Sequence, residues 1–318
     1  MKNFWTKFNK PFYVLAPMAG ITDSAFRQIS KEFGADVVYS EMASVTALVY
    51  NPGPTLEMLK FDKNERPYVV QLFGSNPDHF AQAVKLVTKK IKPDGIDINF
   101  GCPVKKVQKQ GAGAVLMNDL QLAHQIIETT IKNTNLPVSI KCRSQVGEVD
   151  VLNFLSSVKD LDIKAVMIHG RTLAQGHSGS VDFAIIKKAR QLVRGALIAN
   201  GGVKDFVTVQ EMLEKTGADG IGIGQGALGR PWIFRELTSP RPSPKLGEGD
   251  FLKIALKHAN LAYKLKGEQG IIEMRKHLCW YVTGLINARE LRKKLVNVKT
   301  LREIEDVFNN QLSIFNDQ

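Results

Sequence analysis

The 318-residue sequence has few of the features that mark secreted, metal-binding or membrane-spanning proteins. It contains only three cysteines, and none of them has a paired spacing typical of a zinc site or a disulfide framework. Low cysteine usage of this kind favours a reducing compartment. No apolar run approaches the length that spans a bilayer, and residues 1–10 lack the apolar core of a signal peptide. We therefore expect a cytoplasmic protein that is a monomer and has no metal or membrane partner.

Acidic residues are also in deficit, with 31 Asp and Glu against 43 Lys and Arg, which gives a formal net charge of +12. Residues 251–318 carry 12 Lys and Arg against 7 Asp and Glu, so they are the more basic part per residue. A basic surface suggests a polyanionic partner, and nucleic acid is the first candidate. The alternative is a solvated helix face. Five basic residues of this segment are candidates for contacts with the partner: Arg275, Lys276, Arg289, Arg292 and Lys293.

Eight short apolar runs alternate with segments of helical periodicity. The runs are residues 12–16, 37–40, 68–73, 95–99, 138–142, 165–169, 196–200 and 220–224. Such alternation predicts parallel strands joined by right-handed crossovers, and eight units favour a closed (β/α)8 TIM barrel. An open doubly wound sheet is the alternative, but no GxGxxG turn follows the first run.

The barrel pattern ends before a segment rich in proline and glycine. Residues 238–250, TSPRPSPKLGEGD, are typical of a linker or surface insertion. Four helical patterns follow, at residues 251–266, 271–285, 288–296 and 301–315, enough for a small all-α helical bundle. The sequence therefore predicts a catalytic barrel over residues 1–237, a linker over 238–250 and a helical domain over 251–318.

Cys102 lies where a reactive side chain is expected. It follows the fourth apolar run, between Gly101 and Pro103, on a loop at the end of a predicted strand. An arbitrary free cysteine more often packs as a small hydrophobe, and this interpretation fits Cys142 and Cys279 better. The loop position favours a reactive role for Cys102.

Glycines follow the last two apolar runs. Gly201 and Gly202 come after the seventh, and Gly224 is the last residue of the eighth, after which Gln225 opens a predicted helix. In a TIM barrel this pattern is typical of a phosphate site, because backbone N–H groups and a helix N-terminus attract an anion. The alternative is that the glycines only form tight turns.

The other polar residues at predicted strand ends fit a flat, phosphate-bearing cofactor. Lys141 could form a Schiff base, as in a barrel aldolase, or place positive charge beside a flavin. The small apolar segment Pro17, Met18 and Ala19 could form a wall against the ring, and Gln71 offers an amide to its edge. A flavin mononucleotide explains all of these features, whereas an aldolase leaves Cys102 without a role.

Two further residues follow the sixth run, in Ile168–Thr172. His169 and Arg171 are candidates for contacts with cofactor or substrate, although a histidine closing a buried strand is often a core residue. No second histidine has the spacing of a metal ligand.

These motifs resemble those of the tRNA-dihydrouridine synthases over nearly the whole chain. The matching segments are APMAG, YSEM, QLFGS, DINFGCPV, IHGRT, ANGG, GIGQGALGRPW and MRKHLCWY, which occur in this order. The sequence looks most like the bacterial B-type branch. The resemblance implies a barrel that binds FMN, followed by a helical domain that binds tRNA.

The resemblance also implies a reaction and a set of residue roles. NADPH would reduce FMN, and the C5=C6 bond of specific tRNA uridines would be reduced to 5,6-dihydrouridine, with hydride from FMN N5 to C6 and a proton from Cys102 to C5. Asn99 and Arg171 would contact the substrate. The FMN contacts carry over to the following residues: Pro17, Met18, Ala19, Gln71, Lys141, His169, Asn200, Gly201, Gly202, Gly224 and Gln225.

The sequence departs from the family pattern at two places. Gln225 stands where the family usually has arginine, which removes a charge from the phosphate site. Residues 142–147 also lack the family's glycine–tryptophan pair. Two other functions remain open at this point: an FMN-dependent reductase of free pyrimidines or other small molecules, and a tRNA-binding chaperone without catalysis.

Overall fold

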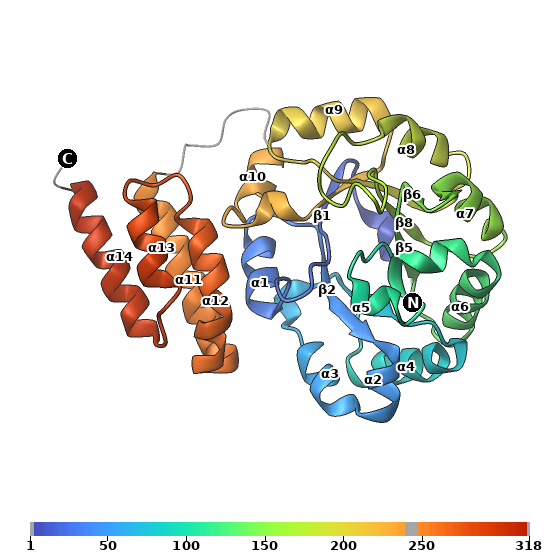
Figure 1. Ribbon diagram of the computed structural model, residues 1–318, viewed down its shortest axis with the longest axis horizontal. Helices are drawn as coiled ribbons and strands as arrows, with labels where there is room; N and C mark the ends of the chain where they lie inside the picture. Colours follow the sequence, from blue (N-terminus) through green and yellow to red (C-terminus); the bar gives the residue numbers. More distant parts are fainter. Residues whose placement is uncertain (1–2, 239–246, 317–318) are drawn as a thin grey trace.

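Eight parallel strands close into a barrel in the computed structural model, which describes residues 3–238 and 247–316. The hydrogen-bonded order around the barrel is β1-β10-β9-β8-β5-β4-β3-β2, so each strand pairs with its sequence neighbours (Figure 1). The barrel strands are β1 Phe12–Leu15, β2 Val37–Ser44, β3 Tyr68–Phe73, β4 Gly95–Phe100, β5 Val138–Arg143, β8 Ala165–His169, β9 Ala196–Asn200 and β10 Gly220–Ile223. The predicted TIM barrel is therefore confirmed.

Helices surround the barrel, as right-handed crossovers require. They are α1 Ser24–Glu32, α2 Val45–Tyr50, α3 Pro52–Met58, α4 Pro77–Lys90, α5 Lys105–Gln108, α6 Leu120–Lys132, α7 Val151–Ser157, α8 Phe183–Ala189, α9 Phe206–Thr216 and α10 Ile233–Thr238. A two-stranded hairpin, β6 Gln145–Val146 with β7 Val149–Asp150, follows β5 and was not predicted.

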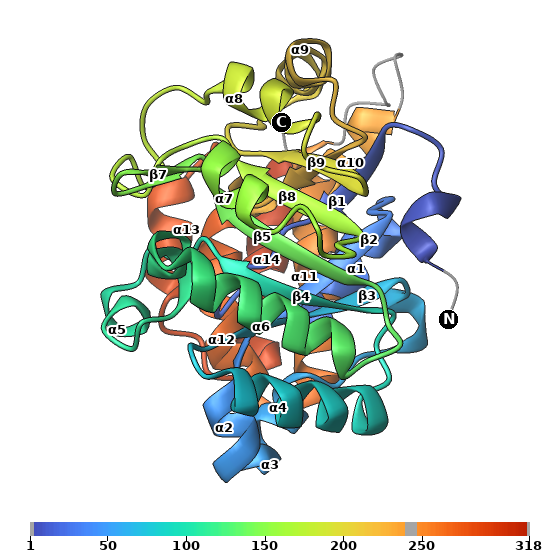
Figure 2. The same ribbon diagram turned by 90° about the vertical axis from the view of Figure 1, so that its right-hand side faces the viewer.

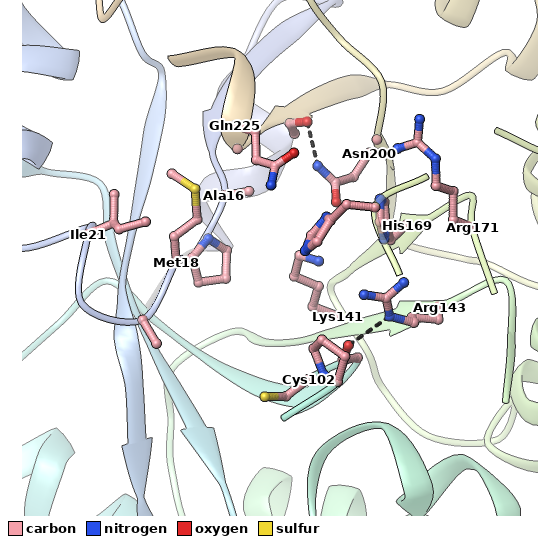
Figure 3. Close-up of a pocket in the computed structure, with 18 of the residues that line it drawn as sticks. Ala16, Met18, Ile21, Cys102, Lys141, Arg143, His169, Arg171, Asn200 and Gln225 are labelled. Atoms are coloured by element: carbon pink, nitrogen blue, oxygen red, sulfur yellow. Dashed lines mark hydrogen bonds between the residues drawn. The ribbon is translucent and has the colours of Figure 1, made fainter. Parts of the chain in front are cut away.

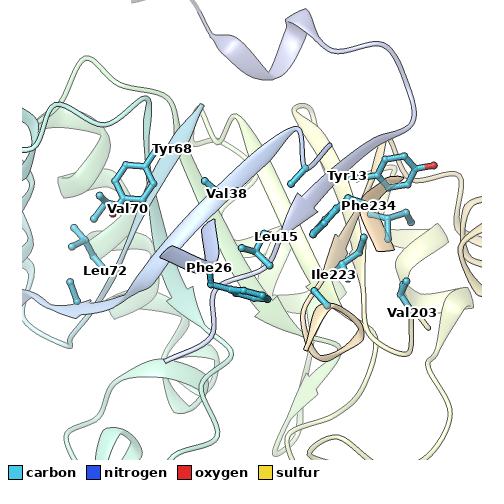
Figure 4. Close-up of a cluster of buried hydrophobic side chains, with 14 of the residues drawn as sticks. Tyr13, Leu15, Phe26, Val38, Tyr68, Val70, Leu72, Val203, Ile223 and Phe234 are labelled. Carbon is cyan, nitrogen blue, oxygen red and sulfur yellow. The ribbon is translucent and has the colours of Figure 1, made fainter. Parts of the chain in front are cut away.

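Alternation along the strands builds two separate apolar layers. On β1, Phe12 and Val14 point into the barrel, whereas Tyr13 and Leu15 pack outward beneath the helices. Figure 4 shows part of this outer layer, including Leu15, Val38 and Leu72. The barrel interior is completed by Phe4 and Trp5 of the N-terminal segment, which pack with Phe12. The basic and aromatic N-terminus thus contributes to the core of the barrel.

Four helices follow the barrel and form the bundle that the sequence predicted. They are α11 Glu248–Lys266, α12 Glu268–Tyr281, α13 Ala288–Leu295 and α14 Leu301–Asn316. Helix α11 begins inside the predicted linker, and residues 239–246 of that linker lie outside the described residues. Figure 1 shows the bundle beside α1, at one side of the barrel. The division into domains stays a prediction.

The bundle packs on the barrel through a buried aromatic cluster. Phe26 of α1 contacts His258 and His277, with ring centroids 5.6 and 5.0 Å apart. Burial lowers the pKa of His258 to about 4 and that of His277 well below its usual value, so both rings are neutral at pH 7. Lys266 pairs with Asp23 at 2.9 Å at the edge of this cluster. Apolar and ionic contacts therefore fix the bundle against α1.

Arg27 forms a buried ion pair under the same helix. Its side chain is fully buried, pairs with Glu65, and donates to the carbonyls of Thr22 and Lys60. A buried charge needs all of these partners, because removing one leaves the other desolvated and unpaired.

Arg27→Ala should therefore lower the free energy of unfolding by about 3–5 kcal/mol, since it leaves the Glu65 carboxylate buried without its cation. Urea denaturation followed by circular dichroism measures this loss. The matched control is Lys132→Ala on α6, which breaks an exposed 2.7 Å pair with Glu128 and should cost less than about 1 kcal/mol. Equal losses in the two variants would contradict the assignment of Arg27 as a structural anchor.

Candidate active site

A cavity of about 840 Å³ opens where the barrel strands end. All fourteen barrel residues predicted for the site line it: Pro17, Met18, Ala19, Gln71, Asn99, Cys102, Lys141, His169, Arg171, Asn200, Gly201, Gly202, Gly224 and Gln225. Figure 3 shows several of them pointing toward a common space. The five candidate residues of the helical tail do not line this cavity. Which residues hold a ligand remains a prediction.

A chain of hydrogen bonds positions the Cys102 loop. Gln71 donates from Nε2 to Asp97 Oδ2 at 2.8 Å, and Asn99 donates from Nδ2 to Gln71 Oε1 at 2.8 Å. Asn99 Oδ1 in turn accepts from the backbone N–H groups of Gly101 and Cys102, at 3.0 and 2.9 Å. Both ends of the Gln71 amide are thus engaged by protein groups, which leaves its second N–H for a ligand edge.

Asp97 anchors this chain from inside the barrel. Its side chain is fully buried, and Ser139 Oγ donates to its Oδ1 at 2.6 Å. Burial raises the pKa of Asp97 to about 6, against the opposing effect of its hydrogen-bond donors. At pH 7 the group is therefore mainly a carboxylate that accepts from both donors. The sequence analysis missed Asp97, although an acidic residue inside an apolar strand is itself a signal.

The environment of Cys102 favours the protonated thiol. Its side chain is 8% exposed and packs with Val107 and Ala112, in a small cluster beside the cavity. Burial raises the pKa of the thiol above its ordinary value, although the nearby Arg143 and Lys141 partly oppose this effect. A protonated thiol at a cavity wall can act as a general acid. Cys142 is fully buried on β5, which confirms its predicted packing role.

Cations dominate the cavity wall next to the Cys102 loop, where Arg143 Nε donates to the carbonyl of Gly101 at 2.9 Å. Burial, together with the charge of Arg143, lowers the pKa of Lys141 to about 8, so the ammonium still carries its charge at pH 7 in most molecules. Within the described part of the chain, no carboxylate lies within ion-pair distance of this ammonium. Burial and the same cations lower the pKa of His169 to about 2, so its ring is neutral. The wall thus presents positive charge with no paired anion.

The glycine loop after β9 forms a cradle. Gly201 and Gly202 have φ of +111° and +74°, and a Cβ at Gly201 would lie 2.6 Å from Cδ2 of His169. Their N–H groups have no hydrogen-bond partner among residues 3–238 and 247–316. Arg171 Nη2 would lie 3.5 Å from a Cβ at Gly202, so a guanidinium stands beside the cradle. Free N–H groups and a cation suit a phosphate group.

The helix predicted directly after the eighth strand is wrong. A short 3₁₀ turn, Gln225–Ala227, follows β10, and α10 begins only at Ile233. The turn cannot extend because Gly226 packs against the carbonyl of Val203, and Gly229 adopts φ of +65° against the backbone of Trp280. The N–H groups of this loop can still face an anion, but no α-helix dipole supports them.

Several cavity residues were not predicted as site residues from the sequence, among them His177 and Trp280. His177 lies beside His169, with ring centroids 5.9 Å apart, on the loop that follows β8. Trp280 reaches the cavity from α12, so it is separated from every barrel residue of the site in the sequence. No local pattern could have placed it there, because its position depends on how the bundle packs against the barrel.

The Cys102 thiol should react slowly with iodoacetamide at pH 7, because only the thiolate is nucleophilic and burial raises its pKa. Its alkylation rate should reach half of its maximum above about pH 8.5, the ordinary value for a free thiol. Mass spectrometry of the Cys102 peptide across a pH series measures this midpoint, with the partly exposed Cys279 as the internal reference. A midpoint below about pH 8 would contradict a protonated Cys102.

Among the described residues, no group of three or more His, Cys, Asp or Glu side chains has the arrangement of a metal site. No helix in the same part of the chain is long and apolar enough to cross a membrane.

Solved structures of other proteins share the barrel fold. Histamine dehydrogenase from Rhizobium sp. 4-9 superposes with a TM-score of 0.57 and 12% identity, over 95% of this chain and 62% of that one. The old yellow enzyme homologue from Zymomonas mobilis gives a TM-score of 0.53 and 12% identity, over 74% of this chain and 91% of that one. At such identities the likeness shows the barrel fold alone.

Sequence relatives are more informative. A probable tRNA-dihydrouridine synthase from Aquifex aeolicus is 32% identical over 301 residues, covering 93% of this chain and 95% of the relative. One from Rickettsia bellii is 35% identical over 291 residues, covering 88% of both chains. The sequence model described as dihydrouridine synthase matches residues 14–316. The chain therefore belongs to the dihydrouridine synthase family of enzymes.

Proposed function

We propose that this protein reduces specific uridines of tRNA to 5,6-dihydrouridine, with FMN as the bound cofactor and NADPH as the reductant. The observation that carries the proposal is the single cavity that gathers a protonated thiol, an unpaired ammonium and a cradle of free N–H groups. The names of the sequence relatives support the tRNA substrate. The B-type branch, the monomeric state and the cytoplasmic location stay predictions.

The cavity residues fit FMN. Gly201 and Gly202 offer N–H groups to its phosphate, and Arg171 beside them offers a cation, which offsets the neutral Gln225. Met18 and the small residues around it leave a flat apolar surface for the ring. When bound, FMN supplies the hydride that uracil C6 accepts. Lys141 would hold positive charge toward the bound ring and would stabilise the negative charge that the ring gains on reduction.

A residue of the protein itself supplies the proton that completes the reduction of the uracil. Cys102 holds a proton on Sγ and donates it to C5, so the C5=C6 double bond gains one hydride and one proton. Asn99 fixes the loop that carries this thiol and lines the cavity beside it. The neutral ring of His169 contributes a hydrogen-bonding nitrogen to the cavity without adding charge.

The proposal is tested with the purified protein, NADPH and tRNA from a strain that lacks dihydrouridine. Mass spectrometry of the digested tRNA should show dihydrouridine at defined positions. A protein that binds FMN and oxidises NADPH but forms no dihydrouridine in tRNA would refute the proposed substrate.

Cys102→Ala should retain bound flavin and its reduction by NADPH, because Cys102 does not touch the phosphate cradle. Its rate of dihydrouridine formation should fall roughly 10²–10⁴-fold, which is the usual contribution of a general acid. Cys142→Ala on β5 is the matched control, since this buried thiol does not line the cavity and its loss should leave the rate within a few-fold. Turnover by Cys102→Ala at the control rate would exclude the thiol as the proton donor.

The basic tail residues are proposed to hold tRNA phosphates. Arg289 and Arg292 of α13 are exposed, and Lys293 beside them forms only an exposed pair with Glu290. Arg275 and Lys276 are already engaged, because Arg275 donates to the carbonyl of Val298 and Lys276 to that of Gly20. The exposed face of α13 is therefore the better candidate for phosphate contacts.

Replacing Arg289, Arg292 and Lys293 together with alanine should weaken tRNA binding and flatten its salt dependence, by a slope of about 0.7–0.9 per lost phosphate contact. Filter binding over a series of salt concentrations measures both effects, and NADPH oxidation should be unchanged. A control that removes three equally exposed cations from α4, Lys85, Lys89 and Lys90, should bind like the wild type. Equal slopes in all three proteins would rule out α13 as the docking surface.

A further inference from the structure

Trp280 is a cavity residue that belongs to the helical bundle. It lies on α12 and lines the same cavity as Cys102 and Lys141. The other two tryptophans, Trp5 and Trp232, are 4% and 6% exposed and pack in the core, whereas Trp280 is only half-buried. A large aromatic ring at a cavity wall, supplied by a segment outside the barrel, calls for a ligand contact.

Three contacts fix Trp280 at this position. Gly229 of the barrel packs against its backbone so closely that a Cβ there would lie 2.8 Å from the Trp280 Cβ. The buried ring of His277 meets the indole edge to face, with centroids 5.2 Å apart and an angle of 86°. Lys276, the residue before His277, donates to the carbonyl of Gly20 in the loop that follows β1. The indole is therefore held rigidly before any ligand arrives.

Trp280 and the Cys102 thiol lie on different sides of the cavity. Gly229, against which Trp280 packs, follows β10, and β10 stands opposite β4 in the barrel order. Cys102 follows β4, so the thiol and the indole lie on opposite sides of the cavity. The basic helix α13 begins shortly after α12 on the indole side. RNA held by α13 therefore passes Trp280 before a base reaches Cys102.

We infer that Trp280 stacks on a base of the tRNA that flanks the target uridine. The inference rests on the proposed function. A uridine that enters the cavity must leave its stack, and this costs a few kcal/mol that new contacts have to offset. Aromatic side chains supply such contacts to unstacked bases in single-stranded RNA. Met18, Ile21 and Leu228 line the same cavity as Trp280, so the cavity offers apolar side chains as well as the indole.

The test compares Trp280→Ala and Trp280→Phe with the wild-type holoenzyme. Affinity for tRNA lacking dihydrouridine is measured over a series of salt concentrations, together with flavin content. Trp280→Ala should weaken binding roughly five- to a hundredfold at every salt concentration, as expected for the loss of one stacked base. The salt slope should not change, because no phosphate contact is lost. Trp280→Phe should retain most of the affinity.

Tyr263→Ala is the matched control, because Tyr263 is an exposed aromatic residue on α11 that does not line the cavity. It should bind tRNA like the wild type. Wild-type affinity in Trp280→Ala would overturn the inference, and so would a loss of flavin in that variant, which would place the indole on the cofactor. Failure of the wild-type protein itself to form dihydrouridine would instead refute the proposed function, so the two outcomes are distinct.

Discussion

The buried Asp97 carboxylate is the interaction on which the geometry of the cavity depends. It holds Gln71, Gln71 holds Asn99, and Asn99 holds the backbone of the loop that carries Cys102. The three side chains that form this series of hydrogen bonds lie on adjacent strands, β3 and β4. The pairing register of these two strands therefore sets the distances between them. The loop that carries Cys102 is thereby tied by hydrogen bonds to the barrel strands.

Positive charge gathers in the cavity next to the Cys102 loop, which accepts a hydrogen bond from Arg143. The side near Lys141, Arg143 and Arg171 is cationic, and burial keeps His169 neutral among these residues. Cys102 packs with the apolar Val107 and Ala112, and its burial raises the pKa of the thiol despite these cations. In the proposed function, the cations face an anionic cofactor and the thiol donates a proton, as a reaction that adds a hydride and a proton to one double bond requires.

The sequence was sufficient to predict the barrel and most of the site, because both depend on local patterns. Alternating apolar runs such as 68–73 coincide with β3, and the strand-end positions of Lys141 and His169 place them at one face. The sequence analysis did not predict the full length of β2 or the β6–β7 hairpin. The ends of these strands are set by strand pairing and not by the intrinsic propensity of their residues. The 3₁₀ turn after β10 was also missed, because packing of Gly229 against Trp280 decides it.

The helical bundle contributes a residue to the candidate site in addition to those of the barrel. Phe26 of α1 contacts both His258 and His277, and α12, the helix that carries His277, also places Trp280 at the cavity (Figure 2 shows α11, α12 and α14 behind the barrel strands). These contacts join regions more than 200 residues apart in the sequence. The bundle thus completes the cavity wall, and in the proposed function the same module also binds the RNA.

The most direct test of this account is anaerobic. The holoenzyme is reduced with one equivalent of NADPH, the excess is removed, and reoxidation of the flavin is followed by its absorbance after addition of substrate. Undermodified tRNA should reoxidise the flavin and gain dihydrouridine in equal amount, whereas free uridine monophosphate at the same concentration should not. Equally fast reoxidation by uridine monophosphate, or none by tRNA, would contradict the claim that barrel and bundle together select a tRNA uridine.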